Sequence, residues 1–171
     1  VPPMAPGFTL TSHDGEEISL SDYRGKVVVL EWFNPDCPFV KRHHEKMSTM
    51  VDLARKYADQ GVVWLAVNST HYMDAATSAQ WHEKWGIPYP VLVDRDGKVG
   101  RAYSAKTTPH MFIVDGDGAI IYRGAIDDDP RGKKGQAAAN YVEGALRDVL
   151  ANRPVETADT APYGCSVKYA K

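Results

Sequence analysis

The stretch VVVLEWFNPDCPFVKRHHEKMSTM, residues 27–50, decides how the rest of the chain is organised. It opens with a nearly continuous run of β-branched and aromatic residues, interrupted only by Glu31. Such a run is typical of a strand that is covered on both faces in the middle of a sheet. From Pro38 to about Gln60, apolar residues recur at steps of three and four, which predicts one long amphipathic helix that ends at Gly61.

Cys37 lies in the turn between this strand and the helix. Because proline has a fixed φ and no N–H, Pro38 fits the first helical position and places Cys37 at or beside the N-cap. Free N–H groups and the helix dipole stabilise a thiolate there, and cysteine pKa values at helix starts fall to roughly 3.5–7.5 from about 8.5. A lone cysteine is often only a small buried apolar residue. The setting nevertheless favours a reactive thiol.

Length and composition fit one globular domain. The chain has 171 residues, 43% of them hydrophobic, and a net charge of −2 without long blocks of like charge. This pattern argues against a nucleic-acid groove or a polybasic membrane patch. No apolar run approaches the roughly 18 residues of a membrane span. The two cysteines, Cys37 and Cys165, are too few for a disulfide-rich scaffold, and neither a C-x-x-C pair nor a tetrahedral zinc pattern occurs.

The remaining chain reads as short strands and helices with one long tail. A strand, helix, strand order around the long helix predicts parallel pairing and a right-handed crossover. Asp-Gly turns indicate two hairpins. The predicted elements are an N-terminal hairpin within 4–20, a second central strand at 62–68, a helix at 74–85, a hairpin at 111–123, a helix at 136–151 and an extended tail at 152–171.

Three stretches resemble thioredoxin-like redoxins of the alkyl-hydroperoxide-reductase/thiol-specific-antioxidant branch. Residues 32–40, WFNPDCPFV, resemble the active-site turn, with Cys37 at the attacking position. Residues 107–115, TTPHMFIVD, resemble the segment whose proline, here Pro109, is cis and lies against the active cysteine. The opening, from APGFTL at 5–10 to LSDYRGK at 20–26, is similar to the start of that branch.

This resemblance implies an α/β, three-layer fold with a central mixed sheet, an N-terminal hairpin and helices on both faces. It covers about residues 5–150, so we expect a thioredoxin-like domain at 1–152 and a C-terminal tail at 153–171 that carries Cys165. It also implies an enzyme, either a thiol-disulfide oxidoreductase or an antioxidant thiol peroxidase. The residues leave these two activities open, since both begin from the same thiolate.

The chain departs from the family pattern at two places. Thioredoxins carry a second cysteine three residues after the first, where this chain has Val40, so the active-site turn holds a single cysteine. Peroxiredoxins have threonine or serine three residues before the cysteine, where this chain has Asn34. Cys165 could supply the missing sulfur from a distance if the tail folds back over the helix end; otherwise it is an idle or structural thiol.

The candidate site is therefore built around Cys37 as nucleophile, with Cys165 as the second catalytic thiol. Pro109 in the cis form would remove an N–H from the edge that faces the substrate, and His110 points either at the thiolate or into the sheet. Arg42, one turn past Cys37, either favours the thiolate or is an ordinary solvated arginine. The supporting residues are Trp32, Asn34, Pro38, Arg42, Pro109 and His110.

The expected partners are protein thiols and disulfides or small peroxides, together with an external thiol reductant; no cofactor and no nucleic acid is expected. The chain begins at Val1 rather than at methionine, which suggests that an N-terminal segment was removed, in the cell or by truncation. Together with the resemblance to exported thioredoxin-like proteins, this predicts an extracytoplasmic location, periplasmic or exported.

Two alternatives belong to other classes. A metallochaperone-like module resembling the copper-delivering Sco proteins could bind copper or zinc through Cys37, Cys165 and one of His43 or His44, with His71 and His110 as further candidates. Two points count against this alternative. Sco sites need two cysteines in one turn, where this chain has one. Adjacent helical histidines point about 100° apart, so at most one of His43 and His44 readily faces the site. The other alternative is a redox-inactive binding module. The acidic run at 127–129 could bind a cation, but an exposed acidic loop is expected.

Overall fold

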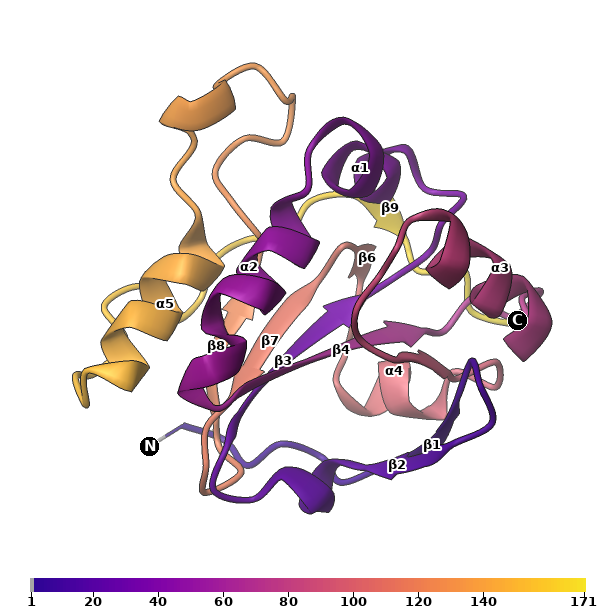
Figure 1. The fold of residues 1–171 in the computed structure, drawn as a ribbon, viewed down its shortest axis with the longest axis horizontal. Coiled ribbons are helices and arrows are strands. Elements are labelled where there is room, and N and C mark those ends of the chain that lie inside the picture. The colour runs from indigo at the N-terminus through magenta and orange to yellow at the C-terminus, as the bar shows by residue number, and fades with distance from the viewer. Residues whose placement is uncertain (1) are drawn as a thin grey trace.

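The computed structural model describes residues 2–171, and its centre is a seven-stranded mixed sheet (Figure 1). The central strand β3 pairs in parallel with β4 and antiparallel with β7. The spatial order of the sheet is β2-β1-β5-β4-β3-β7-β8. The strands are β1 Thr9–Ser12, β2 Glu17–Ser19, β3 Val27–Trp32, β4 Val62–Asn68, β5 Val91–Val93, β7 Met111–Val114 and β8 Ile120–Gly124.

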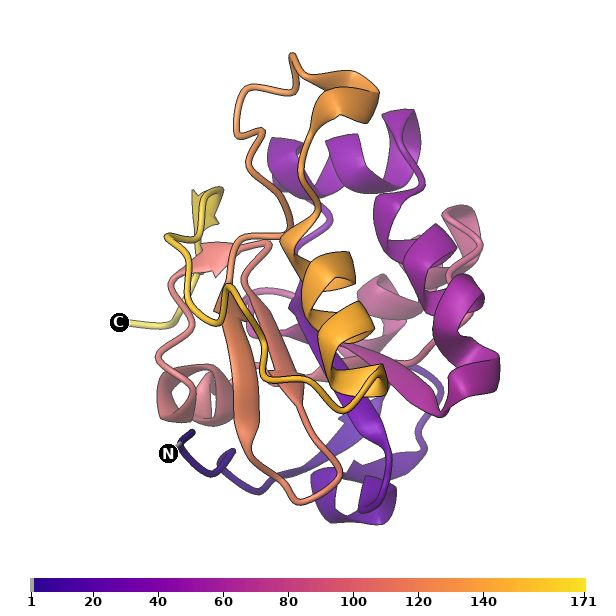
Figure 2. The same ribbon diagram turned by 90° about the vertical axis from the view of Figure 1, so that its left-hand side faces the viewer.

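Helices cover both faces of this sheet, so the expected thioredoxin-like, three-layer α/β architecture is confirmed (Figures 1 and 2). The helical segments are η1 Leu20–Tyr23, α1 Pro38–Lys41, η2 Arg42–Lys46, α2 Thr49–Tyr57, η3 Ala58–Gln60, α3 Ala75–Lys84, α4 Lys98–Ala102, η4 Gly135–Ala137 and α5 Tyr141–Leu150. Within residues 2–171, none of these helices has the length and apolar character needed to cross a bilayer.

Alternate residues of β3 face two separate hydrophobic clusters, as the period of a strand requires. Val29 packs on one face, in the cluster that α1, α2 and α5 cover. Leu30 and Trp32 pack on the other face, against residues near α4. Full burial of a large apolar side chain contributes about 1.5–3 kcal/mol. The two clusters therefore hold β3 rigidly in place, and Cys37 follows directly from its end on the α1 face.

The long helix expected from Pro38 to Gln60 is interrupted, and this prediction is wrong. The turn η2 is π-helical, because the N–H of Met47 bonds to the carbonyl of Arg42. Met47 itself is extended, with φ −125° and ψ 148°, and α2 starts again at Thr49. Three consecutive residues of η2 reach buried polar partners in different directions, and these tertiary contacts override helical periodicity.

The last helix is shorter than the predicted 136–151. Asn140 caps α5, since its side chain accepts a hydrogen bond from the Glu143 N–H, and η4 is a separate turn before it. After α5 the chain is extended, as expected, and runs back across the molecule (Figure 2). There its strand β9, Cys165–Ser166, pairs antiparallel with β6, Thr107–Thr108.

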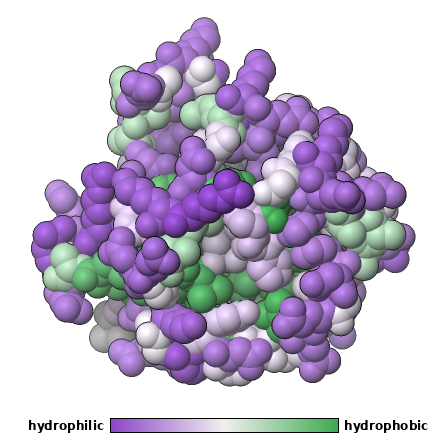
Figure 3. Space-filling model, viewed as in Figure 1, coloured by the Kyte–Doolittle hydropathy of each residue, from purple (hydrophilic) through white to green (hydrophobic). Residues whose placement is uncertain are grey.

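The molecular surface is mainly polar. The face seen in Figure 3 is largely hydrophilic, and hydrophobic residues appear there as smaller areas between polar ones. In the part of the chain that the structure describes, the large hydrophobic residues that are exposed are Met4 and Tyr72.

Candidate active site

The turn after β3 presents Cys37 as the N-cap of α1, with Pro38 at the start of the helix as predicted. Asn34 shapes this turn from a buried position. Its side-chain oxygen accepts the Asp36 N–H at 2.9 Å, and its carbonyl accepts the Cys37 N–H at 3.0 Å. The amide of Asn34 is therefore engaged within the turn itself.

The two cysteines meet although 128 positions separate them. Cys37 Sγ lies 2.6 Å from Cys165 Sγ, and both thiols are free. Cys165 is brought there by β9, where it lies opposite Thr108 of β6, and the Cys37 thiol also donates to the Thr108 carbonyl at 3.1 Å. Three segments that are distant in the sequence thus meet at Cys37, and their ribbons, α1, β6 and β9, lie close together in Figure 1. With the tail in this position, Cys37 is only 2% exposed.

The two thiols differ in acidity. Burial opposes ionisation of Cys37, but the hydrogen bond with Cys165, the neighbouring Thr108 hydroxyl and backbone N–H groups outweigh it and lower the pKa of Cys37. Burial and the hydrogen bond and charge of Cys37 raise the pKa of Cys165 to about 11. Cys37 is therefore the thiol that ionises first, and Cys165 is the one that keeps its proton.

Pro109 and His110, two of the predicted supporting residues, lie between β6 and β7. The Thr108–Pro109 peptide bond is cis. The His110 ring stacks on Phe112, with centroids 4.5 Å apart, and its Nδ1 accepts the Lys106 N–H at 3.1 Å. Burial, assisted by the charge of Lys106, lowers the pKa of His110 to about 4, so the ring is neutral near pH 7. Its contacts place it against the sheet and the chain before β6.

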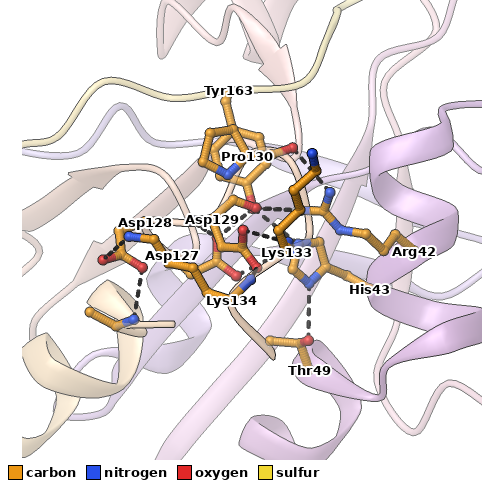
Figure 4. Close-up of polar contacts among 11 residues, drawn as sticks. Arg42, His43, Thr49, Asp127, Asp128, Asp129, Pro130, Lys133, Lys134 and Tyr163 are labelled. Atoms are coloured by element: carbon orange, nitrogen blue, oxygen red, sulfur yellow. Dashed lines mark hydrogen bonds and ion pairs between the residues drawn. The ribbon is translucent and has the colours of Figure 1, made fainter. Parts of the chain in front are cut away.

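Trp32 and Arg42 are engaged away from the sulfurs. The Trp32 indole is fully buried in the cluster on the α4 side and donates to Ser69 Oγ at 3.0 Å. The Arg42 guanidinium donates to the carbonyls of Asp129 and Pro130, at 2.8 and 3.0 Å, and to the Tyr163 hydroxyl at 3.2 Å. Arg42 thus joins η2 to the acidic loop and to the tail (Figure 4).

The adjacent histidines diverge. His43 is fully buried, with Nδ1 2.9 Å from Thr49 Oγ1 and Nε2 3.1 Å from the Tyr163 hydroxyl. His44 Nε2 lies 2.7 Å from Glu31 Oε2 inside the body of the protein. The structure does not gather these rings with the two sulfurs. Over residues 2–171, no three side chains of His, Cys, Asp or Glu are arranged to hold a metal ion.

The expectation of an exposed acidic loop is wrong for Asp127 and Asp129, which are each only 4% exposed. The Asp129 carboxylate accepts the backbone N–H groups of Lys133 and Lys134. Asp127 accepts the Asp129 N–H and the Tyr163 hydroxyl proton. Sequence reasoning missed Asp127 and Tyr163 as parts of the site's surroundings. The available signal was the spacing of Tyr163, two residues before Cys165 and so on the same side of an extended segment.

The chain is similar in sequence to curated relatives. The thiol-disulfide oxidoreductase ResA of Geobacillus kaustophilus is 35% identical over 116 residues, which is 68% of this chain and 64% of that protein's length. Its homologue from Geobacillus thermodenitrificans is 34% identical over 116 residues, with the same shares of 68% and 64%. The chain therefore matches somewhat less than two thirds of the length of these relatives.

Solved structures extend the similarity to nearly the whole chain. An uncharacterised conserved protein from Geobacillus kaustophilus superposes with a TM-score of 0.88 at 31% identity, over 99% of this chain and 92% of that one. A hypothetical protein from Sinorhizobium meliloti 1021 gives a TM-score of 0.88 at 25% identity, over 99% and 94%. The model of the AhpC/TSA family matches residues 1–123, from the N-terminal hairpin through the cysteine turn to β8. The fold, the position of Cys37 and this match agree, and the chain belongs to the AhpC/TSA family.

Proposed function

We propose that this protein is a thiol-disulfide oxidoreductase in which Cys37 is the attacking thiol and Cys165 is the resolving thiol. The observation that carries the proposal is the 2.6 Å separation of the two sulfurs, which belong to the start of α1 and to the tail. A disulfide needs an S–S distance of about 2.05 Å, so only a small displacement separates the thiols from a bridge. The ResA relatives, which are named thiol-disulfide oxidoreductases, support the same reaction class.

The reaction follows from thiol-disulfide exchange. The Cys37 thiolate attacks one sulfur of a substrate disulfide; a mixed disulfide forms, and the first substrate sulfur leaves as a thiolate. Cys165 loses its proton and attacks Cys37 Sγ, which breaks the mixed disulfide and releases the second substrate thiolate. The substrate is thereby reduced by two electrons, and the protein holds a Cys37–Cys165 disulfide. An external dithiol reduces this bridge and restores the starting state.

The acidity difference supports this division of roles. The lowered pKa of Cys37 favours its thiolate, and the raised pKa of Cys165, about 11, keeps Cys165 a hydrogen-bond donor until Cys37 has been consumed. Once Cys37 is in a mixed disulfide its negative charge is gone, so one cause of the raised Cys165 pKa disappears. Resolution is then easier than premature attack by Cys165 on the substrate.

One feature favours a disulfide over a peroxide as substrate. Asn34 stands at the position where the resemblance to peroxiredoxins calls for threonine or serine, and its side chain is already bonded within the turn. Cys37 is 2% exposed beneath the tail, so the tail must move before a protein disulfide reaches the sulfur. The partners in this proposal are disulfide-bearing proteins and an external dithiol reductant. An oxidising, extracytoplasmic compartment is where such disulfides persist.

The test uses the fact that the chain has only two cysteines. Wild type, Cys37→Ser and Cys165→Ser are mixed with oxidised glutathione or with hydrogen peroxide, quenched in acid and weighed by mass spectrometry. We expect wild type to form an internal bridge, Cys165→Ser to stop at a glutathione adduct, and Cys37→Ser to react at least about tenfold more slowly, because burial, the largest cause, still raises the pKa of its remaining thiol.

Two results would overturn the proposal. One is an adduct that forms on Cys165 as fast in Cys37→Ser as on Cys37 in Cys165→Ser, which would remove the assigned order of attack. The other is a reaction with hydrogen peroxide far faster than with any disulfide, which would make the protein a peroxidase. The location is tested separately, by fractionating cells that express the native gene and finding the protein outside the cytoplasm.

A further inference from the structure

The tail is fastened just before Cys165 by a buried polar cluster, which we call the tail latch and define as Arg42, His43, Asp127 and Tyr163 (Figure 4). Tyr163 belongs to the tail, and the other three belong to η2 and the acidic loop. The Tyr163 hydroxyl lies 3.1 Å from His43 Nε2 and 3.2 Å from Arg42 Nη2, and it donates its proton to the Asp127 carboxylate. All three body residues thus converge on one oxygen of the tail.

The hydrogen bonds of the latch are consistent only with one set of donors. Tyr163 has a single hydroxyl proton, which goes to Asp127, so the other two contacts are donated to its oxygen by Arg42 and by His43. Burial, with the neighbouring Arg42 charge, lowers the pKa of His43 in spite of Asp127, so the ring is neutral. A neutral ring that donates from Nε2 must accept at Nδ1, where the Thr49 hydroxyl is 2.9 Å away. Burial and Asp127 raise the pKa of Tyr163, so the hydroxyl keeps its proton.

Removal of the tail would break this arrangement at its centre. With the tail docked, His43 is fully buried and Asp127 is 4% exposed, and each would lose the hydrogen bond that it shares with Tyr163. Hydrogen bonds that involve charged partners are stronger than neutral ones. On the far side of Cys165, the Tyr169 hydroxyl donates to the Ala105 carbonyl, and the Arg101 guanidinium lies 4.7 Å from the centroid of the Tyr169 ring. The latch differs from that attachment because Tyr163 meets three groups of the body at one oxygen, and two of them, His43 and Asp127, are buried.

We propose that Tyr163 is a positioning residue for the resolving step: the latch returns the tail to the place where Cys165 attacks Cys37. This inference rests on the proposed function. It gives the latch opposite effects on the two half-reactions. A docked tail covers Cys37 and slows attack on the substrate, whereas it raises the effective concentration of Cys165 at the mixed disulfide.

The experiment compares Tyr163→Phe with wild type and with Tyr23→Phe, a control on η1, remote from the sulfurs. Oxidised glutathione is the probe, and each half-reaction is followed by acid quench and mass spectrometry. For Tyr163→Phe we expect adduct formation on Cys37 to be as fast as in wild type or several times faster. We expect resolution of the adduct to be about ten- to hundredfold slower, the range expected for losing a buried, charge-assisted hydrogen bond. Tyr23→Phe should match wild type in both steps.

A second measurement separates the latch from general loss of structure. Hydrogen–deuterium exchange of Tyr163→Phe should be faster in residues 160–169 and unchanged in β3 and β4. Equal slowing of both half-reactions, or faster exchange throughout the sheet, would show a structural role and overturn the inference. Resolution at the wild-type rate would also overturn it while leaving the proposed function intact. If wild type forms no internal Cys37–Cys165 bridge at all, the proposed function itself is overturned, and the inference that rests on it falls with it.

Discussion

Two buried polar clusters start from neighbouring residues of the same π-helical turn, and they do different work. His44 leads into the body network, defined as Glu31, His44, Trp64 and Tyr89, whose members all lie between the sheet and the helices that cover it. His43 leads into the tail latch. The body network joins parts that stay together as long as the protein is folded, whereas the latch joins the body to a tail that leaves and returns in the proposed reaction.

The charge states of the two clusters also differ. Glu31 is fully buried, and burial alone would raise its pKa, but the His44 charge and hydrogen bonds from His44, Trp64 and Tyr89 lower it. Glu31 is therefore ionised, and its charge is compensated within the body. In the latch, by contrast, the histidine is neutral and the tail supplies a single hydroxyl. In the body network the carboxylate and all its donors belong to the body, whereas in the latch the tail contributes one hydroxyl and its partners Arg42, His43 and Asp127 stay on the body.

The largest expected effect comes from Glu31→Leu. Glu31→Leu removes the buried acceptor that His44, Trp64 and Tyr89 share, and each buried group left without its hydrogen bond costs about 1–3 kcal/mol. We expect that loss in the free energy of unfolding, measured with urea. In the fraction that remains folded, the rate of Cys37–Cys165 bridging should stay within about threefold of wild type.

Glu31→Gln is the milder partner variant, since its amide oxygen can still accept from Trp64 and Tyr89. It should lose less stability than Glu31→Leu. If either variant slows the resolving step as much as Tyr163→Phe is expected to, the body network and the latch are coupled, and the two clusters do not have separate roles.

Gly164→Ala should give the reverse pattern. Gly164 has φ +144°, and a Cβ there would meet the Thr108 carbonyl oxygen at 2.2 Å. The tail then cannot lie against β6, so we expect bridging to slow on the order of 100-fold, equivalent to about 2.8 kcal/mol. Stability should fall much less than in Glu31→Leu, because the body network does not include the tail.

The matched control is Gly144→Ala on α5, where an added Cβ meets nothing within 4 Å. An exposed helical alanine in place of glycine should stabilise the protein by roughly 0.5–1 kcal/mol and leave bridging unchanged. Bridging at the wild-type rate in Gly164→Ala would show that Cys165 reaches Cys37 without the β6–β9 pairing.

Acid should act on the two clusters in separate pH windows. The folded state lowers the pKa of His43, so as the pH falls this residue binds a proton in the unfolded chain before it does in the folded protein. The free energy of unfolding therefore falls as the pH drops below about 6.5, by at most about 1.4 kcal/mol per pH unit for one group. His110, with its pKa near 4, adds to the same window. Glu31 has a lowered pKa, so its contribution is present above about 4.3 and is lost only as pH falls further.

Urea unfolding at several pH values between 7 and 3.5 measures both windows. In His43→Gln the fall in stability below about pH 6.5 should be shallower than in wild type, while the loss below about pH 4.3 remains. A slope between pH 6.5 and 5 that is the same in His43→Gln and wild type would mean that the latch does not hold a neutral histidine.

The sequence predicts the body far better than the latch, for a physical reason. The apolar run of β3 and the Asp-Gly hairpin turns are local signals, and each was enough to place its element. Pro38 likewise places Cys37 at the start of α1. The contact between His43 and Tyr163 spans 120 positions and involves one hydroxyl, so no periodic pattern in the sequence predicts it. The break at Met47 has the same origin, because it results from polar partners that are far away in the chain.

Within the candidate site, patterns could identify which segments meet but not which way side chains turn. The motif at 107–110 does lie against Cys37, through the Thr108 carbonyl. Arg42 was expected either at the thiolate or in solvent, and instead it binds the acidic loop and the tail. Its orientation depends on the loop at 127–130, in which Asp127 and Asp129 are buried although an acidic composition taken alone is typical of a surface segment.

The smallest expected effect concerns a hydroxyl that belongs to neither cluster. Among the described residues, Thr108 Oγ1 is buried without a hydrogen-bond partner, beside the carbonyl that accepts from the Cys37 thiol. Once Cys37 ionises it no longer donates, and the Thr108 hydroxyl can turn to donate to the thiolate. Thr108→Val should therefore raise the pKa of Cys37 by about 0.5–1 unit, in line with a hydrogen bond worth about 1 kcal/mol.

The pH dependence of iodoacetamide labelling measures this shift in Cys165→Ser, where Cys37 is the sole thiol. The control is Thr107→Val in the same background, since Thr107 Oγ1 donates to the Pro109 carbonyl at 2.8 Å rather than to a sulfur. The same labelling curve for Thr108→Val and Thr107→Val would mean that the thiolate draws its stabilisation from the backbone and the tail alone. A shift confined to Thr108→Val would show that the Thr108 hydroxyl also stabilises the Cys37 thiolate. This hydroxyl stays in place when the latch opens, and it therefore keeps Cys37 ionised while the substrate approaches.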